Sequence, residues 1–291
     1  MKAVIATAGY STRFLPVCKS VPKSMLPILE VPIIHEIVKE CVDAGVTDII
    51  FITSFGNNPA EDYFYNRPDL ETFLKETGKE ERYERFREVF GKVNITIVRQ
   101  NKALPYGNGS PVLAAKPWLN VGEPFVFMFS DDLVLSDVSA VKQLIDEYNM
   151  RKAEDSNIGG VVAAQEVLEK ETQKYGVVSF KDVKRRVIDT IVEKPQENPP
   201  SLLATYGRYL VDYSIFDYLN KENIQQGELY FPVALDKLCK VKNIYCKAID
   251  GEWLTTGDPL NYLKAQIRYA MVRDEYRLEL NKLFDNPRDC F

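Results

Sequence analysis

The sequence KAVIATAGYSTR, residues 2–13, joins a short apolar run to a turn of small residues. The run at residues 2–7 is typical of a buried β-strand. Ala8 and Gly9 follow it, and Arg13 comes shortly after them. The backbone N–H groups of such a turn can hold phosphate oxygens, and a nearby guanidinium adds charged donors. The stretch therefore predicts a phosphate-handling loop at the end of a buried strand.

Further strands and helices alternate along the first half of the chain. Strand-like segments lie at 48–53, 93–99 and 124–129. Helix-like segments lie between them at 32–44, 80–90 and 109–116. This alternation predicts crossover connections and a largely parallel sheet covered on both faces. Ligands of open α/β sheets bind at the carboxyl ends of strands, so we expect Thr7 and Ser130 at a ligand-binding edge.

The pattern changes after Asp137, a candidate N-cap for a helix over 138–149. Closely spaced strands are expected at 158–167, 175–180, 187–193 and 202–211. Two helices and a strand follow at 214–221, 230–240 and 243–249. The second half therefore predicts mixed or antiparallel strands added beside the parallel core.

The chain ends with one helical pattern from Pro259 to about Phe284. Its length predicts a C-terminal helical arm over 259–291, after a main unit of residues 1–258. A second copy of the chain could pack on this arm and form a homo-oligomer. Packing of the arm on its own chain is an equal alternative.

Composition narrows the classes of partner. The net charge of -5 argues against nucleic acid and anionic membrane as partners. No stretch reaches the length of a membrane span, and the N-terminal apolar run is too short for a signal segment. Five cysteines without a CxxC pair fit reduced thiols. These features predict a cytoplasmic protein.

The single histidine, His35, lies in a helix-like segment, where we expect it on the helix surface. One histidine excludes a multi-histidine zinc site, and any Ser/His/Asp triad would have to use His35. Carboxylates and lysines must therefore carry most of the polar chemistry.

The segment ATAGYSTRFLPVCKSVPKSMLPI, residues 6–28, resembles the signature of the sugar-phosphate nucleotidyltransferases. It has neither the GxxxxGK[ST] of a P-loop nor the GxGxxG of a dinucleotide fold. The resemblance continues in order along nearly the whole chain. Its further segments are RQNKALPYGNGSPVLAAKP (99–117), FMFSDDLVL (127–135), KYGVV (174–178), VEKP (192–195), GRYLV (207–211) and WLTTGDPLNYLKA (253–265).

The resemblance implies a Rossmann-like, GT-A-like α/β fold with a mixed, mainly parallel sheet flanked by helices and a small β addition. It assigns nucleotide binding to about 1–137 and sugar binding to about 138–258. The implied enzyme joins UTP and glucose 1-phosphate into UDP-glucose and pyrophosphate, with Mg²⁺ and without a covalent intermediate. Catalysis would then consist mostly of positioning and charge neutralisation.

The resemblance also implies roles for charged residues. Arg13 and Lys23 would contact the phosphates. Asp131 would bind Mg²⁺. Adjacent strand residues point in opposite directions, so Asp132 is expected to make a supporting or substrate contact instead.

Base and sugar recognition follow from the same resemblance. The nucleotide would be held by Ala8, Gly9, Gln100, Gly107, Gly109 and Asp132. The Gln100 amide can pair with a pyrimidine edge, and the glycines allow close backbone approach. The sugar phosphate would be held by Gly176, Glu193 and Lys194.

Three departures from the family pattern bear on this interpretation. Ser11 stands where relatives have glycine or alanine, and PYGNGSPV replaces PLGLGHAV, so Asn108 and Ser110 could alter the nucleotide pocket. Thr255 stands where many relatives have a metal-binding aspartate. We expect Asp131, water and substrate phosphates to hold Mg²⁺, with Asp258 as a further candidate ligand.

Several alternatives remain open at this stage. A thymidylyltransferase or another sugar-1-phosphate nucleotidyltransferase would use the same fold, since thymine presents the pairing edge of uracil. A catalytically silent regulatory homologue would still bind a sugar nucleotide. A glycosyltransferase is a more distant alternative, and the loop at residues 6–28 argues against it because it suits a triphosphate.

Overall fold

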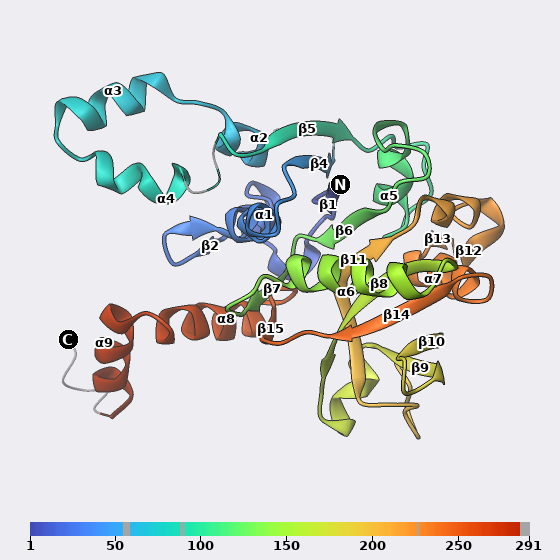
Figure 1. Cartoon of the computed structure of the whole chain (residues 1–291). Helices are drawn as coiled ribbons and strands as arrows, with labels where there is room; N and C mark the ends of the chain where they lie inside the picture. The colour runs from blue at the N-terminus through green and yellow to red at the C-terminus, as the bar shows by residue number, and fades with distance from the viewer. Residues whose placement is uncertain (55–58, 88, 90, 226, 286–291) are drawn as a thin grey trace.

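The computed structural model describes residues 1–54, 59–87, 89, 91–225 and 227–285. Nine strands of this described part form one sheet in the order β5-β4-β1-β6-β11-β8-β14-β10-β9 (Figure 1). The first four in this order run parallel. They are β5 (Asn94–Arg99), β4 (Asp48–Thr53), β1 (Lys2–Ala6) and β6 (Phe125–Phe129). The predicted parallel half of the sheet is therefore present.

The second half of the sheet is mixed. β11 (Leu203–Val211) lies antiparallel between β6 and β8 (Ile158–Glu166). Beyond β8 the order continues with β14 (Asn243–Ala248), β10 (Val187–Glu193) and β9 (Gly176–Asp182). β14 is parallel to β8, whereas β9 and β10 form an antiparallel hairpin. This hairpin is the small β addition expected from the sequence.

Helices cover both faces of the sheet because its central strands are apolar on both sides. One core layer packs the sheet against α1 (Ile33–Asp43) and α6 (Ala140–Glu154). The other packs it against α5 (Ser110–Ala115) and α7 (Phe231–Cys239). The strand ends after β1 and β6 remain open between these layers.

A two-stranded ribbon joins the end of β6 to the C-terminal part of the chain. β7 (Asp132–Leu135) pairs antiparallel with β15 (Glu252–Thr255), and Asp132 lies opposite Thr255. Sequence reasoning did not identify this pairing, because the two strands are short and more than a hundred residues apart. The ribbon places residues 253–257 beside the carboxyl end of β6.

Three local predictions are corrected by the structure. α6 is capped by Ser139, whose hydroxyl accepts a hydrogen bond from the Lys142 backbone N–H at 3.2 Å, so Asp137 is not the N-cap. The segment expected as a helix at 214–221 contains the 3-10 helix η7 (Tyr213–Asp217). The expected closing helix is two helices, α8 (Pro259–Met271) and α9 (Asp274–Asp285).

His35 is buried, contrary to the prediction of a surface position. It is 1% exposed, and its Nδ1 lies 2.9 Å from the Tyr63 hydroxyl of α2 (Pro59–Phe64). Burial, with a smaller effect of Lys39, lowers the pKa of His35 to about 4. The helical pattern alone gave no sign that α2 covers this face of α1.

Shorter elements complete the chain. Two small hairpins pair β2 (Pro27–Ile28) with β3 (Val31–Pro32) and β12 (Ile224–Gln225) with β13 (Glu228–Leu229). The 3-10 helices are η1 (Thr12–Phe14), η2 (Val17–Lys19), η3 (Lys23–Met25), η4 (Glu80–Tyr83), η5 (Lys116–Trp118), η6 (Glu169–Lys174) and η8 (Lys221–Asn223). Helices α3 (Pro68–Glu76) and α4 (Glu84–Arg87) lie between β4 and β5.

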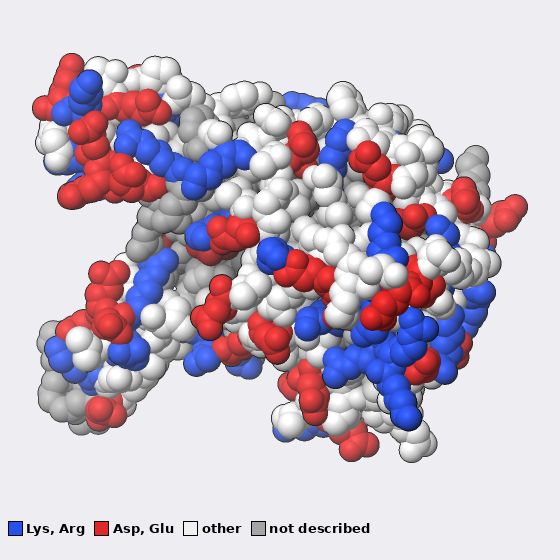
Figure 2. All heavy atoms as spheres, in the orientation of Figure 1, with Lys and Arg blue, Asp and Glu red and all other residues white. Residues whose placement is uncertain are grey.

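Two helical projections leave the same side of the sheet. One contains α3 and α4, and the other contains α8 and α9 (Figure 1). Acidic and basic side chains are mixed over both projections (Figure 2). Cys18, Cys41, Cys239 and Cys246 are free thiols, and Cys290 lies outside the described residues. No helix of the described part is long and apolar enough to cross a membrane.

Candidate active site

A cavity of about 950 Å³ opens at the carboxyl ends of β1, β5 and β6. The loop after β1, residues 100–108 and the end of β6 all contribute to its lining. Ala8, Gly9, Lys23, Gln100, Gly107 and Asp131 border it, as the sequence led us to expect. Ser11 holds a left-handed backbone conformation with φ of 51°, which short polar residues can adopt in a tight turn.

Lys23 and Asp131 meet on the wall of this cavity. The Lys23 ammonium donates a hydrogen bond to Asp131 Oδ2, and the two side chains are 15% and 30% exposed. Lys23 begins η3 and Asp131 follows β6, so the contact joins two segments 108 positions apart. A cation and a carboxylate therefore face the same space.

Arg13, on η1, lies near the same carboxylate but does not border the cavity. Its Nη1 lies 3.4 Å from the Gly257 carbonyl oxygen, to which it donates a hydrogen bond. A Cβ placed on Gly257 would lie 3.6 Å from both Arg13 Nη1 and Asp131 Oδ2, and 3.3 Å from Thr255 Oγ1. These three polar groups therefore converge around Gly257, although they come from separate parts of the chain.

Asp132 points away from Asp131 into the protein. The side chain is buried, and its two oxygens accept hydrogen bonds from the Gly207 N–H at 3.0 Å and from Trp253 Nε1 at 2.8 Å. Burial, reinforced by the charge of Asp131, raises the pKa of Asp132 to about 6. The two carboxylates diverge, but Asp131 lies in the turn between β6 and β7, so the strand alternation expected from the sequence does not apply to this pair.

The cavity lining also includes an amide and a glycine turn. Gln100 follows β5, and its Oε1 is buried without a hydrogen-bond partner in the described chain. Gly107 has φ of +124°, and a Cβ there would lie only 2.4 Å from the Leu229 carbonyl oxygen. The Gly109 N–H donates to this same carbonyl at 2.9 Å, so Gly109 fixes the loop from behind the cavity.

Asn108 and Ser110 make contacts inside the protein. Asn108 Oδ1 accepts a hydrogen bond from the Phe231 N–H at 2.7 Å, at the first residue of α7. The fully buried Ser110 hydroxyl donates to the Pro105 carbonyl oxygen. Both departures from the family pattern thus tie the loop at 105–110 to its surroundings.

The residues expected to bind the sugar phosphate do not border this cavity. Gly176 and Glu193 are directly opposite each other on β9 and β10. Lys194 Nζ lies 3.4 Å from Glu193 Oε1. The ring of Tyr175 packs on Trp253 with 4.8 Å between centroids, and Trp253 in turn binds Asp132. Contacts through Trp253 therefore connect the hairpin to the end of β6.

The carboxylates available to a metal ion are few. No group of three or more His, Cys, Asp or Glu side chains is arranged to hold a metal within the described ranges. Asp258 caps α8, with Oδ1 accepting from the Asn261 N–H at 3.0 Å and Oδ2 from Asn261 Nδ2 at 2.6 Å. Thr255 Oγ1 accepts from the Gly257 N–H at 3.3 Å. Of Asp131, Thr255 and Asp258, only Asp131 borders the cavity.

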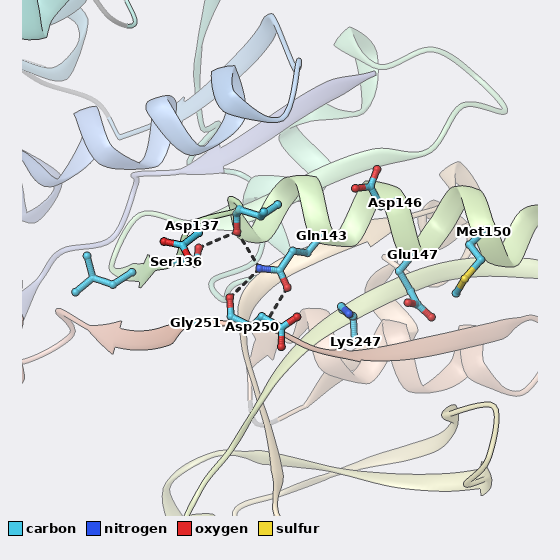
Figure 3. Close-up of a pocket in the computed structure, with 11 residues that line it drawn as sticks. Ser136, Asp137, Gln143, Asp146, Glu147, Met150, Lys247, Asp250 and Gly251 are labelled. Atoms are coloured by element: carbon cyan, nitrogen blue, oxygen red, sulfur yellow. Dashed lines mark hydrogen bonds between the residues drawn. The ribbon is translucent and has the colours of Figure 1, made fainter.

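A second cavity, of about 670 Å³, lies between α6 and the segment from β14 to β15 (Figure 3). Gln143 Nε2 donates to the carbonyl oxygens of Val138 and Asp250 at 2.9 Å, and its Oε1 accepts from the Asp250 N–H at 2.9 Å. No residue expected at the active site borders this cavity. Its central amide is therefore occupied by structural hydrogen bonds.

The fold and the cavity define a nucleotide-binding α/β protein, and sequence comparison specifies its class. The profile of the family described as nucleotidyl transferase matches residues 2–271, and the chain belongs to this family. A Bacillus subtilis (strain 168) protein named UTP–glucose-1-phosphate uridylyltransferase is 34% identical over 283 residues, covering 96% of this chain and 94% of its own.

Solved structures agree with this assignment. A UDP-glucose pyrophosphorylase described as complexed with UDP-glucose is 32% identical, with a TM-score of 0.81 over 94% of this chain and 99% of its own. A UTP-bound enzyme of the same name from Acinetobacter baumannii is 29% identical, with a TM-score of 0.85 over 98% of both chains. The mixed α/β nucleotidyltransferase fold expected from the sequence is confirmed.

Proposed function

We propose that this chain transfers the uridylyl group of UTP to glucose 1-phosphate and so produces UDP-glucose and pyrophosphate. The cavity that Lys23 and Asp131 share with Gln100 and Gly107 carries the proposal. Such a cavity suits a nucleotide because cations can meet the phosphates while an amide meets the base. The names and bound ligands of the relatives support UTP and UDP-glucose as the ligands.

In the proposed reaction a phosphate oxygen of glucose 1-phosphate attacks the α-phosphorus of UTP. The bond between this phosphorus and the α,β-bridging oxygen breaks, and pyrophosphate leaves with that oxygen. Arg13 and Lys23 neutralise charge on the triphosphate and on the leaving group. Mg²⁺, when bound to Asp131, would neutralise further phosphate charge. Each Asp258 oxygen already accepts a hydrogen bond from Asn261, so only the remaining lone pairs of this carboxylate could bind the metal.

The remaining assignments concern recognition. Ala8 and Gly9 offer backbone to the phosphates, and Gln100 reads the uracil edge beside Gly107 and Gly109. Asp132 supports the turn that carries Asp131. Gly176, Glu193 and Lys194 hold the glucose 1-phosphate. Residues 1–137 then form the nucleotide part and 138–258 the sugar part, while 259–291 form an arm for self-association.

Pyrophosphate release tests the proposal. The enzyme would be given Mg²⁺ and glucose 1-phosphate with UTP, dTTP, ATP, CTP or GTP in turn. Galactose 1-phosphate and mannose 1-phosphate would then replace glucose 1-phosphate with the preferred nucleotide. We expect fast release only with UTP and glucose 1-phosphate. Release with another pair would contradict the proposed specificity, and no release despite binding of UDP-glucose would contradict the proposed reaction.

A further inference from the structure

A buried ion pair lies directly behind the turn that carries Asp131. Arg208, on β11, is completely buried, and Glu40, on α1, is 9% exposed. Arg208 Nε donates to Glu40 Oε1 at 3.0 Å, and Arg208 Nη2 donates to Glu40 Oε2 at 2.9 Å. This two-point contact fixes the plane and the rotation of the guanidinium.

The other donors of Arg208 reach the backbone on both sides of the turn. Nη1 donates to the Phe129 carbonyl oxygen at 3.1 Å, and Nη2 donates to the Asp132 carbonyl oxygen at 2.6 Å. Phe129 is the last residue of β6, and Asp132 is the first of β7. One side chain therefore holds the two ends of the turn formed by residues 130 and 131.

Thr256 holds the middle of the same turn. Its N–H and its hydroxyl both donate to the Asp131 carbonyl oxygen, at 2.6 and 2.9 Å. The carbonyls of Phe129, Asp131 and Asp132 are thus all bound by donors from distant segments. The Asp131 side chain is left to face Lys23 and the cavity.

The geometry points to Arg208 as a positioning residue that sets the backbone of the Asp131 turn, with Glu40 orienting its guanidinium. A buried ion pair is weak evidence for stability, because apolar residues of similar size often stabilise as well. Its fork does supply directed donors to the carbonyls of Phe129, Gly207 and Asp132, which an apolar side chain lacks. The consequence for catalysis rests on the proposed function, in which Asp131 acts on the phosphates, and small misplacements of such groups reduce rates strongly.

The chain offers a matched control at the other end of the β7–β15 ribbon. Gln143 is 8% exposed and makes three hydrogen bonds that tie α6 to Val138 and Asp250 (Figure 3). Its loss should destabilise the same ribbon far from Asp131. Gln143→Met therefore separates loss of stability from loss of positioning.

The test compares three enzymes: wild type, Gln143→Met, and the double variant Arg208→Met with Glu40→Gln. The double variant removes both charges of the pair together, and the new amide oxygen can still accept from the Val141 N–H as Glu40 does. Four quantities are measured on each: kcat, the Mg²⁺ concentration that gives half-maximal activity, the thermal midpoint, and hydrogen exchange of the Thr256 amide.

We expect the double variant to lose about 10- to 100-fold in kcat and to need about 10-fold more Mg²⁺. Its Thr256 amide should exchange at least about tenfold faster, because the turn that carries the accepting Asp131 carbonyl is no longer held at its two ends. Gln143→Met should keep kcat and Thr256 exchange within about twofold of the wild-type values, even if its thermal midpoint is lower than that of the double variant.

The inference would be overturned if Thr256 exchange and kcat were the same in the double variant as in wild type. It would also be overturned if Gln143→Met, at the same thermal midpoint as the double variant, lost as much kcat and as much protection of the Thr256 amide. If the double variant does not fold, Arg208→Lys replaces it in the test. The lysine ammonium keeps the positive charge but lacks the forked arrangement of donors of the guanidinium. Hydrogen exchange needs no substrate. A wild type that is inactive with every substrate pair would therefore refute the proposed function while leaving the exchange comparison able to decide the inference.

Discussion

At the residue scale, the contact between Lys23 and Asp131 places opposite charges on the cavity wall. Asp131→Asn keeps the shape of the side chain but removes its charge, and so weakens both the contact with Lys23 and any bond to Mg²⁺. We expect kcat for pyrophosphate release to fall by at least about 100-fold, because charge neutralisation is most of the proposed catalysis.

Asp43→Asn is the matched control for this change. Asp43 forms an ion pair with Lys39 on the exposed face of α1, with 2.7 Å between the charged atoms. Exposed pairs of this kind contribute about 0–1 kcal/mol, so activity should stay unchanged. Normal activity of Asp131→Asn, measured in the same assay, would contradict the proposed role.

His35 gives a prediction about stability. The pKa of buried His35 is lowered to about 4, so the unfolded chain binds more protons than the folded chain between about pH 4 and 6.5. The buried neutral imidazole therefore does not lower the free energy of unfolding above pH 6.5. The free energy of unfolding falls as the pH falls from about 6.5 to about 4, because the unfolded chain takes up a proton that folded His35 does not. The loss by pH 5 is about 2 kcal/mol.

His35→Gln removes this titration and retains a polar atom for Tyr63. Urea denaturation of both proteins at pH 8 and pH 5 would measure the difference. We expect wild type to lose about 2 kcal/mol more than the variant between the two values. Equal losses would show that His35 does not remain neutral in the folded chain.

At the element scale, Asn108 couples the loop over the cavity to α7. Its side chain accepts the Phe231 N–H, one of the free donors at the start of that helix. Asn108→Ala should lower the free energy of unfolding by about 1 kcal/mol. We also expect KM for UTP to rise several-fold with little change in kcat, because the loop borders the proposed nucleotide cavity and the Asn108 side chain is bonded to Phe231 and not to Asp131.

Asn108→Asp is the control, since a carboxylate can also accept at a helix N-terminus. Chemical denaturation and steady-state kinetics on both variants measure the two effects. Equal KM in wild type and Asn108→Ala would remove the proposed coupling between α7 and the nucleotide site.

The sequence pattern predicts the bounds of some elements but not of others. The strand predicted at 48–53 is β4 with the same bounds. A short, nearly continuous apolar run is typical of a parallel strand that is buried on both faces of its sheet. The break between α8 and α9 was missed. Its flanking residues continue a helical pattern, and no glycine or proline marks the end of α8.

At the scale of the whole molecule, α9 stands apart from the core. None of its residues is buried, and Tyr276, Leu278 and Phe284 expose apolar side chains. Truncation after Arg273 keeps the ion pair between Arg273 and Glu30. We expect the truncated enzyme to retain kcat and to lose less than about 1 kcal/mol of stability, since it loses no core contact.

The same truncation tests the proposed arm. If the arm mediates self-association, sedimentation velocity should show an oligomer for the full chain and a monomer for the truncated one. Leu278→Glu with Phe284→Glu should have the same effect while the helix remains. A full chain that sediments as a monomer at all concentrations would contradict self-association.

The sequence by itself determined the order and type of most strands, and it predicted a phosphate-handling loop and the candidate residues Arg13, Lys23 and Asp131. These features are encoded locally, in apolar runs and in motifs of a few neighbouring residues. The resemblance to a family added the substrates and the sugar-binding residues, and the comparisons bear out the family.

Only the tertiary structure decided which groups meet. The burial of His35, the ribbon that brings Trp253 to Asp132, and the pair of Arg208 with Glu40 all depend on long-range contacts. The last two join residues 121 and 168 positions apart. Such contacts depend on how the layers pack around the sheet, and no local pattern of apolar and polar residues specifies the partner of a single buried polar side chain.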